Sequence, residues 1–201
     1  MIVILLVGVL LGLVAGYIRA LRTKREYTLP LQRMELALLA FLPQALVFFV
    51  PQTSPFFSRQ WAALILPLSL GILVLFVWYN RTLPGFALLA LGLLLNLAVI
   101  ASNGGLMPIS PATLAIVHGT QAEDFVNSHT FGTKNIVLPA EQTRLEWLGD
   151  RFTVPDQLPI QFAYSLGDLF LATGAFWALW AGGASRQQNA SAISEADLSS
   201  S

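Results

Sequence analysis

Long apolar runs separated by short polar connections dominate this chain. Each run contains few charged residues and is long enough to cross a bilayer as a helix, which takes about 17–25 residues. The runs cover residues 2–18, 34–50, 61–79, 86–102 and 162–181. The pattern therefore predicts an all-α integral membrane protein, with five transmembrane helices bundled into one membrane domain over residues 1–183. It also predicts a long extracytoplasmic loop, 103–160, between helices four and five, and a disordered cytoplasmic tail at 184–201.

Composition supports the membrane class. Hydrophobic residues make up 55% of the 201 residues and charged residues only 11%, whereas ordinary soluble domains are about 25% charged. Because the formal net charge is zero, we expect no nucleic-acid partner, and we expect membrane lipids around the helices. The chain has no cysteine, which excludes disulfides, thiolate metal sites and a cysteine nucleophile.

The distribution of basic residues predicts the orientation. The first run is followed by its basic residues, whereas a cleaved signal peptide carries its charges before the apolar stretch, so we expect a retained helix. With the amino end outside and the carboxyl end cytoplasmic, the short inner loops receive most of the Lys and Arg, as the positive-inside rule requires. Those inner residues are Arg19, Arg22, Lys24, Arg25, Arg33, Arg81 and Arg186.

Asp168, inside the last apolar run, is the strongest single indication of a working site. A carboxylate in a membrane helix costs about 2.5–3.5 kcal/mol on insertion scales, so it usually faces protein or water. If the helix begins at 162, Gln161, Ser165 and Asp168 share one face. Asp168 and Asn96 would each lie about 10 Å inside the outer ends of their helices. The two polar faces would then meet in the outer half of the membrane, with Gln44 not far below.

A second polar segment follows the fourth run. Asn96 and Asn103 share a helix face if that helix extends far enough. Asn103 opens the sequence Asn-Gly-Gly-Leu-Met-Pro, in which Gly104 and Gly105 permit positive φ and close backbone approach. Ser110-Pro111 then predicts an N-cap and first position of a short helix through about 117.

Two interpretations of these polar residues stay open. Asn and Gln in membrane helices often act only as interhelical hydrogen-bonding contacts, so Asn96, Asn103 and Gln44 form either packing contacts or a ligand-binding pocket. Asp168 is either functional or a hydrogen-bonded structural acid that caps loop amides. His118, in the long loop, is a candidate partner that would neutralise Asp168.

Gly8, Gly12 and Gly16 form a ridge of small residues along the first helix. Such a ridge lets another helix approach closely. It predicts packing within the bundle, with homodimerisation as the alternative.

The long loop contains His118, His129 and several carboxylates, but their spacing matches no zinc signature, so we expect no metal and no cofactor. It is too long for a simple connector, and we expect it to pack over the outer mouth of the bundle.

The positions Asn96, Asn103-Gly-Gly-Leu-Met-Pro and Ser165-Leu-Gly-Asp168 resemble a bacterial family of small multi-pass membrane proteins known only as a domain of unknown function. The resemblance covers the chain from the first helix to Trp180. It implies a bacterial cell membrane and no particular activity.

Three functions fit these observations. The first is a non-enzymatic protein that binds a small or lipidic ligand or is a subunit of a larger membrane complex, which the lack of catalytic motifs favours. The second is a membrane enzyme acting on a lipid-linked or quinone-like substrate, with Asp168 as acid or base. The third is a small transporter or channel component, which five helices without an internal repeat disfavour.

Overall fold

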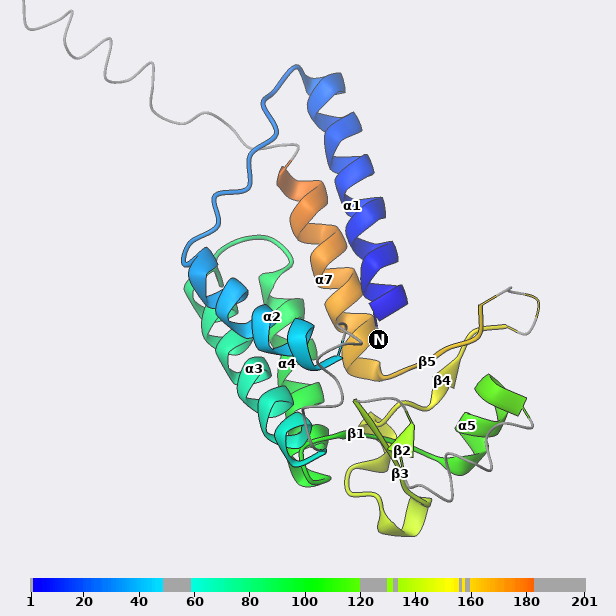
Figure 1. The fold of residues 1–201 in the computed structure, drawn as a ribbon. Helices are drawn as coiled ribbons and strands as arrows, with labels where there is room; N and C mark the ends of the chain where they lie inside the picture. Colours follow the sequence, from blue (N-terminus) through cyan, green and yellow to red (C-terminus); the bar gives the residue numbers. More distant parts are fainter. Residues whose placement is uncertain are drawn as a thin grey trace, which may run out of the picture.

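The computed structural model describes residues 2–48, 59–119, 130–131, 134–155, 157 and 160–182, and this part of the chain is mostly helical (Figure 1). Its α-helices are α1 (Ile2–Thr23), α2 (Met34–Phe48), α3 (Arg59–Tyr79), α4 (Phe86–Ser102), α5 (Pro111–His118) and α7 (Leu166–Gly182). Its strands are β1 (Met107–Ile109), β2 (Thr130–Phe131), β3 (Asn135–Val137), β4 (Phe152–Thr153) and β5 (Ala163–Tyr164). Single 3-10 turns cover Ala140–Gln142 and Glu146–Leu148.

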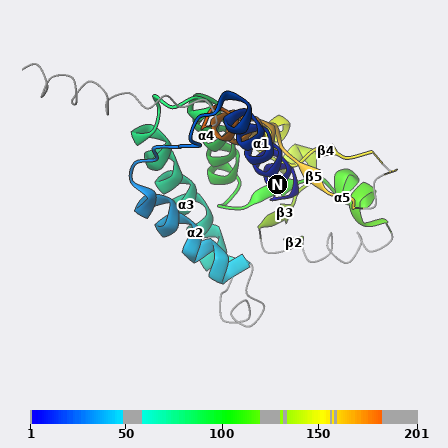
Figure 2. The ribbon, with the colours of Figure 1, turned by 90° about the horizontal axis from the view of Figure 1, so that it is seen from above.

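The five long helices form an open arc rather than a closed ring. α1 packs on α7, α7 on α4, α4 on α3 and α3 on α2. Within the described residues α1 and α2, at the two ends of this order, make no comparable contact, and Figures 1 and 2 both show them apart. The inner faces of all five helices therefore border a common space that α1 and α2 flank.

The glycine ridge of α1 is used inside the bundle. A Cβ on Gly8 would lie 2.5 Å from the carbonyl oxygen of Ala172, and one on Gly12 would lie 2.8 Å from the backbone of Phe176. A Cβ on Gly16 would overlap the carbonyl oxygen of Leu179. α1 thus meets α7 backbone to backbone, and this ridge is covered within a single copy of the chain.

The segment between α1 and α2 is tied to the far ends of two other helices. The Tyr27 hydroxyl donates to the carbonyl oxygen of Leu179 (2.8 Å), which satisfies one of the unpaired carbonyls at the end of α7. Buried Asn80, after α3, accepts from the Gln32 amide (2.8 Å) and donates to the Gln32 carbonyl (2.9 Å).

Two helix ends differ from the apolar pattern by more than two residues. α1 continues to Thr23, past the predicted end at 18, and so includes the basic residues Arg19 and Arg22. α7 begins at Leu166 rather than 162, because Ala163–Tyr164 pairs antiparallel with Phe152–Thr153 as β5. The predicted end of the second run at 50 and the tail at 184–201 lie outside the described residues.

The long loop contains more structure than the sequence predicts. β1 leaves the end of α4, pairs in parallel with β3, and β3 pairs antiparallel with β2. The helix predicted at Ser110-Pro111 is present as α5: the Ser110 hydroxyl accepts from the Thr113 amide (3.0 Å), with Pro111 at the first position. These elements gather where α4 ends and α7 begins (Figure 1).

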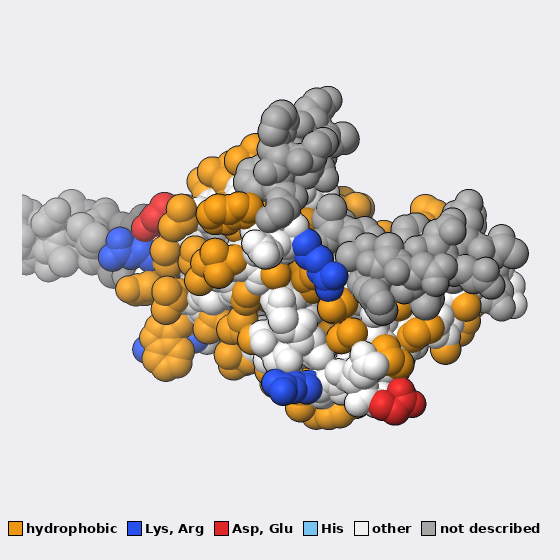
Figure 3. All heavy atoms as spheres, turned by 60° about the horizontal axis from the view of Figure 1, so that its bottom comes forward, with side chains coloured by type: hydrophobic (Ala, Val, Ile, Leu, Met, Phe, Trp, Pro, Cys, Tyr) orange, Lys and Arg blue, Asp and Glu red, His pale blue; other side chains and the backbone are white. Residues whose placement is uncertain are grey.

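Large apolar side chains point outward from the long helices. Leu11, Leu21, Leu68 and Trp78 are each more than half exposed, like many others on these helices. Two helices, Val3–Thr23 and Arg59–Tyr79, are long and apolar enough to cross a membrane, and α2, α4 and α7 are shorter apolar helices. On the loop-bearing end, charged side chains are scattered singly or in small groups among apolar and uncharged ones (Figure 3).

Candidate functional site

A buried polar cluster joins α4 to the start of α7. The Asn96 side-chain amide donates to Asp168 Oδ1 (2.9 Å), and the Ser165 hydroxyl donates to Asn96 Oδ1 (3.0 Å). All three side chains are at most 1% exposed. The side chains of Asn96 and Asp168 are therefore in contact, as expected.

Within this cluster, Ser165 and Asp168 form a capping box. The Ser165 hydroxyl accepts from the Asp168 amide (3.1 Å), and Asp168 Oδ2 accepts from the Ser165 amide (3.3 Å). This reciprocal pair satisfies two backbone donors at the start of a helix, and a negative charge there also suits the helix dipole. Both carboxylate oxygens of Asp168 consequently have protein partners.

Close packing against α4 explains why the residue before Asp168 is a glycine, Gly167. A Cβ on Gly167 would overlap the side-chain oxygen of Asn96. A Cβ on Gly92, one turn before Asn96 on α4, would lie 2.6 Å from the carbonyl oxygen of Gly167. The two glycines let α4 and α7 approach closely enough for Asn96 to reach the capping box.

The expected depth of Asp168 and the expected single face are wrong. Since α7 begins at Leu166, Asp168 lies in its first turn instead of about 10 Å inside, and Gln161 precedes both β5 and the helix. Asn103 also follows the last helical residue of α4, so it does not extend the Asn96 face within the helix.

Asn103 instead fastens the loop to the end of α4. Its side-chain amide donates to the carbonyl oxygens of Val99 and Arg144 (2.8 Å each), and its Oδ1 accepts from the Arg144 amide (2.9 Å). The glycine turn follows with φ of 74° at Gly104 and 85° at Gly105. A Cβ on Gly105 would overlap the carbonyl of Ala63 on α3, so this turn directs the chain from α4 across α3 into β1.

His118 is the last residue of α5, and its pairing with Asp168 stays a prediction. His129 lies outside the described residues. Within the described parts of the chain, no group of three His, Cys, Asp or Glu side chains is arranged to hold a metal ion.

A cavity of about 540 Å³ occupies the space inside the helix arc. Its walls are apolar side chains from the five long helices, including Leu5, Phe41, Leu73 and Leu171. Polar side chains also border it, and they come from two helices and the loop. They are Gln44, Asn96, Lys134, Asn135 and Asp150.

The loop residues reach this cavity because β1 holds them there. The Met107 amide donates to the Lys134 carbonyl (2.9 Å), and Met107 is also the register partner of Asn135. The Asp150 amide donates to the Pro108 carbonyl (3.0 Å). β1 therefore aligns Lys134, Asn135 and Asp150 against the end of α4.

Asp150 is the most unusual group in this part of the molecule. It is 7% exposed, and its Oδ2 accepts from the Asn135 side-chain amide (2.8 Å). Its Oδ1 is buried and has no hydrogen-bond partner among the described residues. Burial raises the pKa of Asp150 to about 7 and the negative charge of Asp168 adds to this, while the hydrogen bond from Asn135 opposes it.

Burial also disfavours the charged form of Lys134. Burial lowers the pKa of its ammonium group to about 8, and the charge of Asp168 opposes that shift. Its Nζ also lies 5.0 Å from the centre of the Phe48 ring, a cation–π contact. The polar border of the cavity thus holds an acid and a base, each with its charged form disfavoured.

Sequence reasoning identified Gln44 and Asn96 but not Lys134, Asn135 or Asp150 as members of this site. The three loop residues lie in segments without apolar periodicity, and the strand that aligns them is three residues long. No local signal distinguishes Asp150 from the other acidic residues of the loop.

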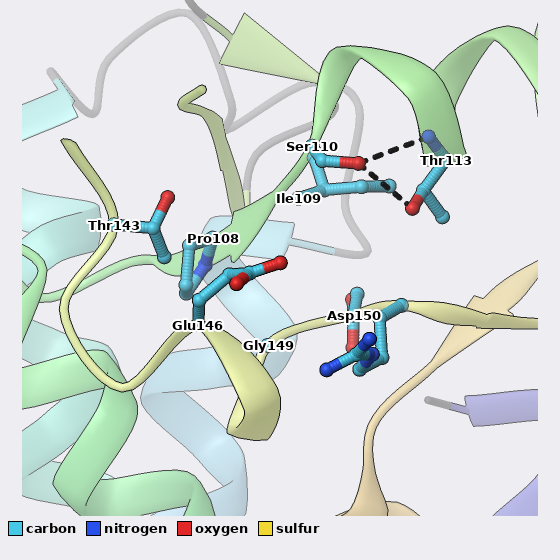
Figure 4. Close-up of a pocket in the computed structure, with 9 residues that line it drawn as sticks. Pro108, Ile109, Ser110, Thr113, Thr143, Glu146, Gly149 and Asp150 are labelled. Atoms are coloured by element: carbon cyan, nitrogen blue, oxygen red, sulfur yellow. Dashed lines mark hydrogen bonds between the residues drawn. The ribbon is translucent and has the colours of Figure 1, made fainter. Parts of the chain in front are cut away.

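A smaller outer pocket of about 150 Å³ shares Asp150 with the cavity (Figure 4). Ser110, Thr113, Thr143, Glu146 and Arg151 also line it. Asp150 therefore lies between an apolar cavity inside the helices and a polar pocket in the loop region.

Comparison with known proteins places this chain in a family without an assigned activity. Residues 28–180 match a family of unknown function, DUF5317. Because this match covers most of the chain, the protein belongs to that family. An uncharacterised protein of Thermotoga maritima is 29% identical over 122 residues, which cover 58% of this chain and 62% of that protein. No solved structure matches the chain.

Proposed function

We propose that this protein spans a bacterial cell membrane with five helices and binds an amphiphilic ligand in its inner cavity. The ligand's apolar part lies among the inward-facing side chains of the helix arc, and its polar group lies against Lys134, Asn135 and Asp150. The cavity itself carries this proposal: its volume of about 540 Å³ falls in the range of ligand sites, about 300–1,000 Å³, and it combines apolar walls with a few polar groups.

The open arc supplies a route for such a ligand. Leu5, Leu6 and Val9 of α1 and Ala37 and Phe41 of α2 border the cavity, although these two helices do not pack on each other. In a membrane, acyl chains would lie beside this gap. A lipid could then enter sideways without crossing the loop region.

A pair of tryptophan variants, one that fills the cavity and one that serves as its control, tests the proposal. Leu73→Trp places a large ring in the cavity, whereas Leu75→Trp places the same ring on the exposed face of the same helix. The protein is purified gently from native membranes, and co-purifying small molecules are quantified by mass spectrometry. We expect a stoichiometric amphiphile with the wild type and with Leu75→Trp, and at least a tenfold loss with Leu73→Trp. Equal amounts in all three proteins, or none in any, would refute ligand binding in this cavity.

The proposed orientation places the amino end and the long loop outside. Since the natural chain has no cysteine, Glu141→Cys and Arg22→Cys each introduce a single thiol at an exposed position. An impermeant maleimide should label Glu141→Cys on intact cells and Arg22→Cys only after permeabilisation. The opposite result would invert the orientation.

The acid and base at the cavity border favour a second candidate, a membrane enzyme acting on a lipid-linked or quinone-like substrate. Groups with perturbed pKa values gather at catalytic sites, and Asp150 and Lys134 have pKa values near 7 and 8. Once the co-purified molecule is known, Asp150→Asn separates the two functions. An enzyme keeps binding and loses conversion, whereas a binding protein loses affinity.

A further inference from the structure

We infer that the ligand is a long-chain lipid with a free hydroxyl group, and that this hydroxyl donates a hydrogen bond to Asp150 Oδ1. The inference rests on the proposed function and names the chemistry of the polar group. Asp150 borders the cavity, is 93% buried, and one of its oxygens lacks a partner among the described residues.

An unpartnered buried carboxylate oxygen favours a ligand that brings a donor. Leaving such an acceptor unpaired is costly because it has lost its water contacts, and hydrogen bonds to charged groups are among the stronger ones in proteins. Asn135 already occupies Oδ2, so Oδ1 is the carboxylate oxygen left for a new donor. Above about pH 7, where Asp150 is ionised, a lipid whose polar group only accepts hydrogen bonds, such as an ether or a quinone, leaves this oxygen unsatisfied.

The charges around the site argue against an anionic head group. Lys134 borders the same cavity, but the negative charge of Asp168 acts on both Asp150 and Lys134. A phosphate would add a further negative charge beside these two acidic groups. A neutral hydroxyl avoids that repulsion.

The position of Asp150 also suits the end of a lipid chain. It lies where the apolar cavity meets the polar outer pocket. A hydroxyl at Asp150 therefore leaves the hydrocarbon chain among the helices and the polar end toward the loop. Long-chain alcohols and alkyl quinols share this chemistry.

Matched probes test the inference on the wild-type protein. At a pH well above the Asp150 pKa of about 7, native mass spectrometry of the detergent-solubilised protein measures binding of 1-dodecanol, dodecyl methyl ether and dodecyl phosphate, which differ only in the polar end. We expect the alcohol to bind about tenfold more tightly than the ether, as one charge-assisted hydrogen bond allows, and more tightly than the phosphate. An alkyl quinol and its quinone form a second pair, and the tighter of quinol and alcohol identifies the source.

The outcomes separate this inference from the proposed function. If alcohol and ether bind equally and Leu73→Trp abolishes the binding of both, the hydroxyl preference is overturned but the proposed lipid cavity stands. Tighter binding of dodecyl phosphate would also overturn it. Failure of every probe to bind would overturn both. In Asp150→Leu, the preference for alcohol over ether should disappear while the ether still binds.

Discussion

Two buried carboxylates in this molecule have opposite surroundings. Asp168 has both oxygens bonded, to Asn96 and to the Ser165 amide, in the first turn of a helix. Asp150 has one oxygen bonded to Asn135 and the other unpartnered among the described residues. It borders both the inner cavity and the outer pocket. A satisfied carboxylate is held by its own fold, whereas an unsatisfied one at a cavity has capacity for a ligand. The comparison therefore supports a structural role for Asp168, and we propose a binding role for Asp150.

Substituting each carboxylate by leucine should give the largest difference in stability. Asp168→Leu removes half of a capping box and leaves buried donors of Asn96 and Ser165 unpaired, at a cost of about 2–4 kcal/mol. Asp150→Leu removes an unsatisfied buried oxygen, which is favourable, and one hydrogen bond from Asn135, which is unfavourable, so we expect a change within about 1 kcal/mol. Thermal melting and the yield of monodisperse protein in detergent measure both effects. Equal losses would end the distinction between the two acids.

A glycine pair gives the next largest effect. Gly167→Ala brings a methyl group into the side-chain oxygen of Asn96, and such overpacking costs about 1–3 kcal/mol. Gly71→Ala is the matched control because a Cβ there meets nothing within 4 Å and the residue lies inside α3. Alanine is the better helix former, so Gly71→Ala should leave the melting temperature unchanged or raise it. A harmless Gly167→Ala would show that Asn96 need not approach the capping box closely.

The pH dependence of stability sharpens the comparison further. The pKa of Asp150 is raised from 3.8 to about 7, so the folded state binds more protons in that window and stability falls as pH rises through it. The pKa of Lys134 is lowered from 10.5 to about 8. The unfolded state therefore binds more protons between about pH 8 and 10.5, and stability rises with pH there.

Together these two groups place a minimum of stability between about pH 7 and 8, which melting temperatures measured across the pH range detect. Asp150→Asn should remove the fall on the acid side, and Lys134→Met the rise on the alkaline side. A flat profile in the wild type, or variants that leave its shape unchanged, would show that these groups are not buried as described.

Parts of the site were within reach of the sequence. The pattern Ser165-x-x-Asp168 is a helix-start signal, and it places the start of α7 at Leu166 more accurately than hydrophobicity does. The apolar run misleads there because Phe162, Ala163 and Tyr164 are apolar as well. By contrast, pairing Met107 with Asn135 joins residues far apart in the chain through strands of three residues, which are too short for an alternating pattern.

The sequence by itself determined that the chain is mostly helical, the extent of α4 and the capped start of α5. These follow from local rules: apolar length and capping residues. Tertiary structure decided that the glycine ridge meets α7, that the helices form an open arc around a cavity, and that Lys134, Asn135 and Asp150 border it. Their positions depend on contacts between distant segments, and burial then alters the pKa values of Lys134 and Asp150, which no local pattern encodes.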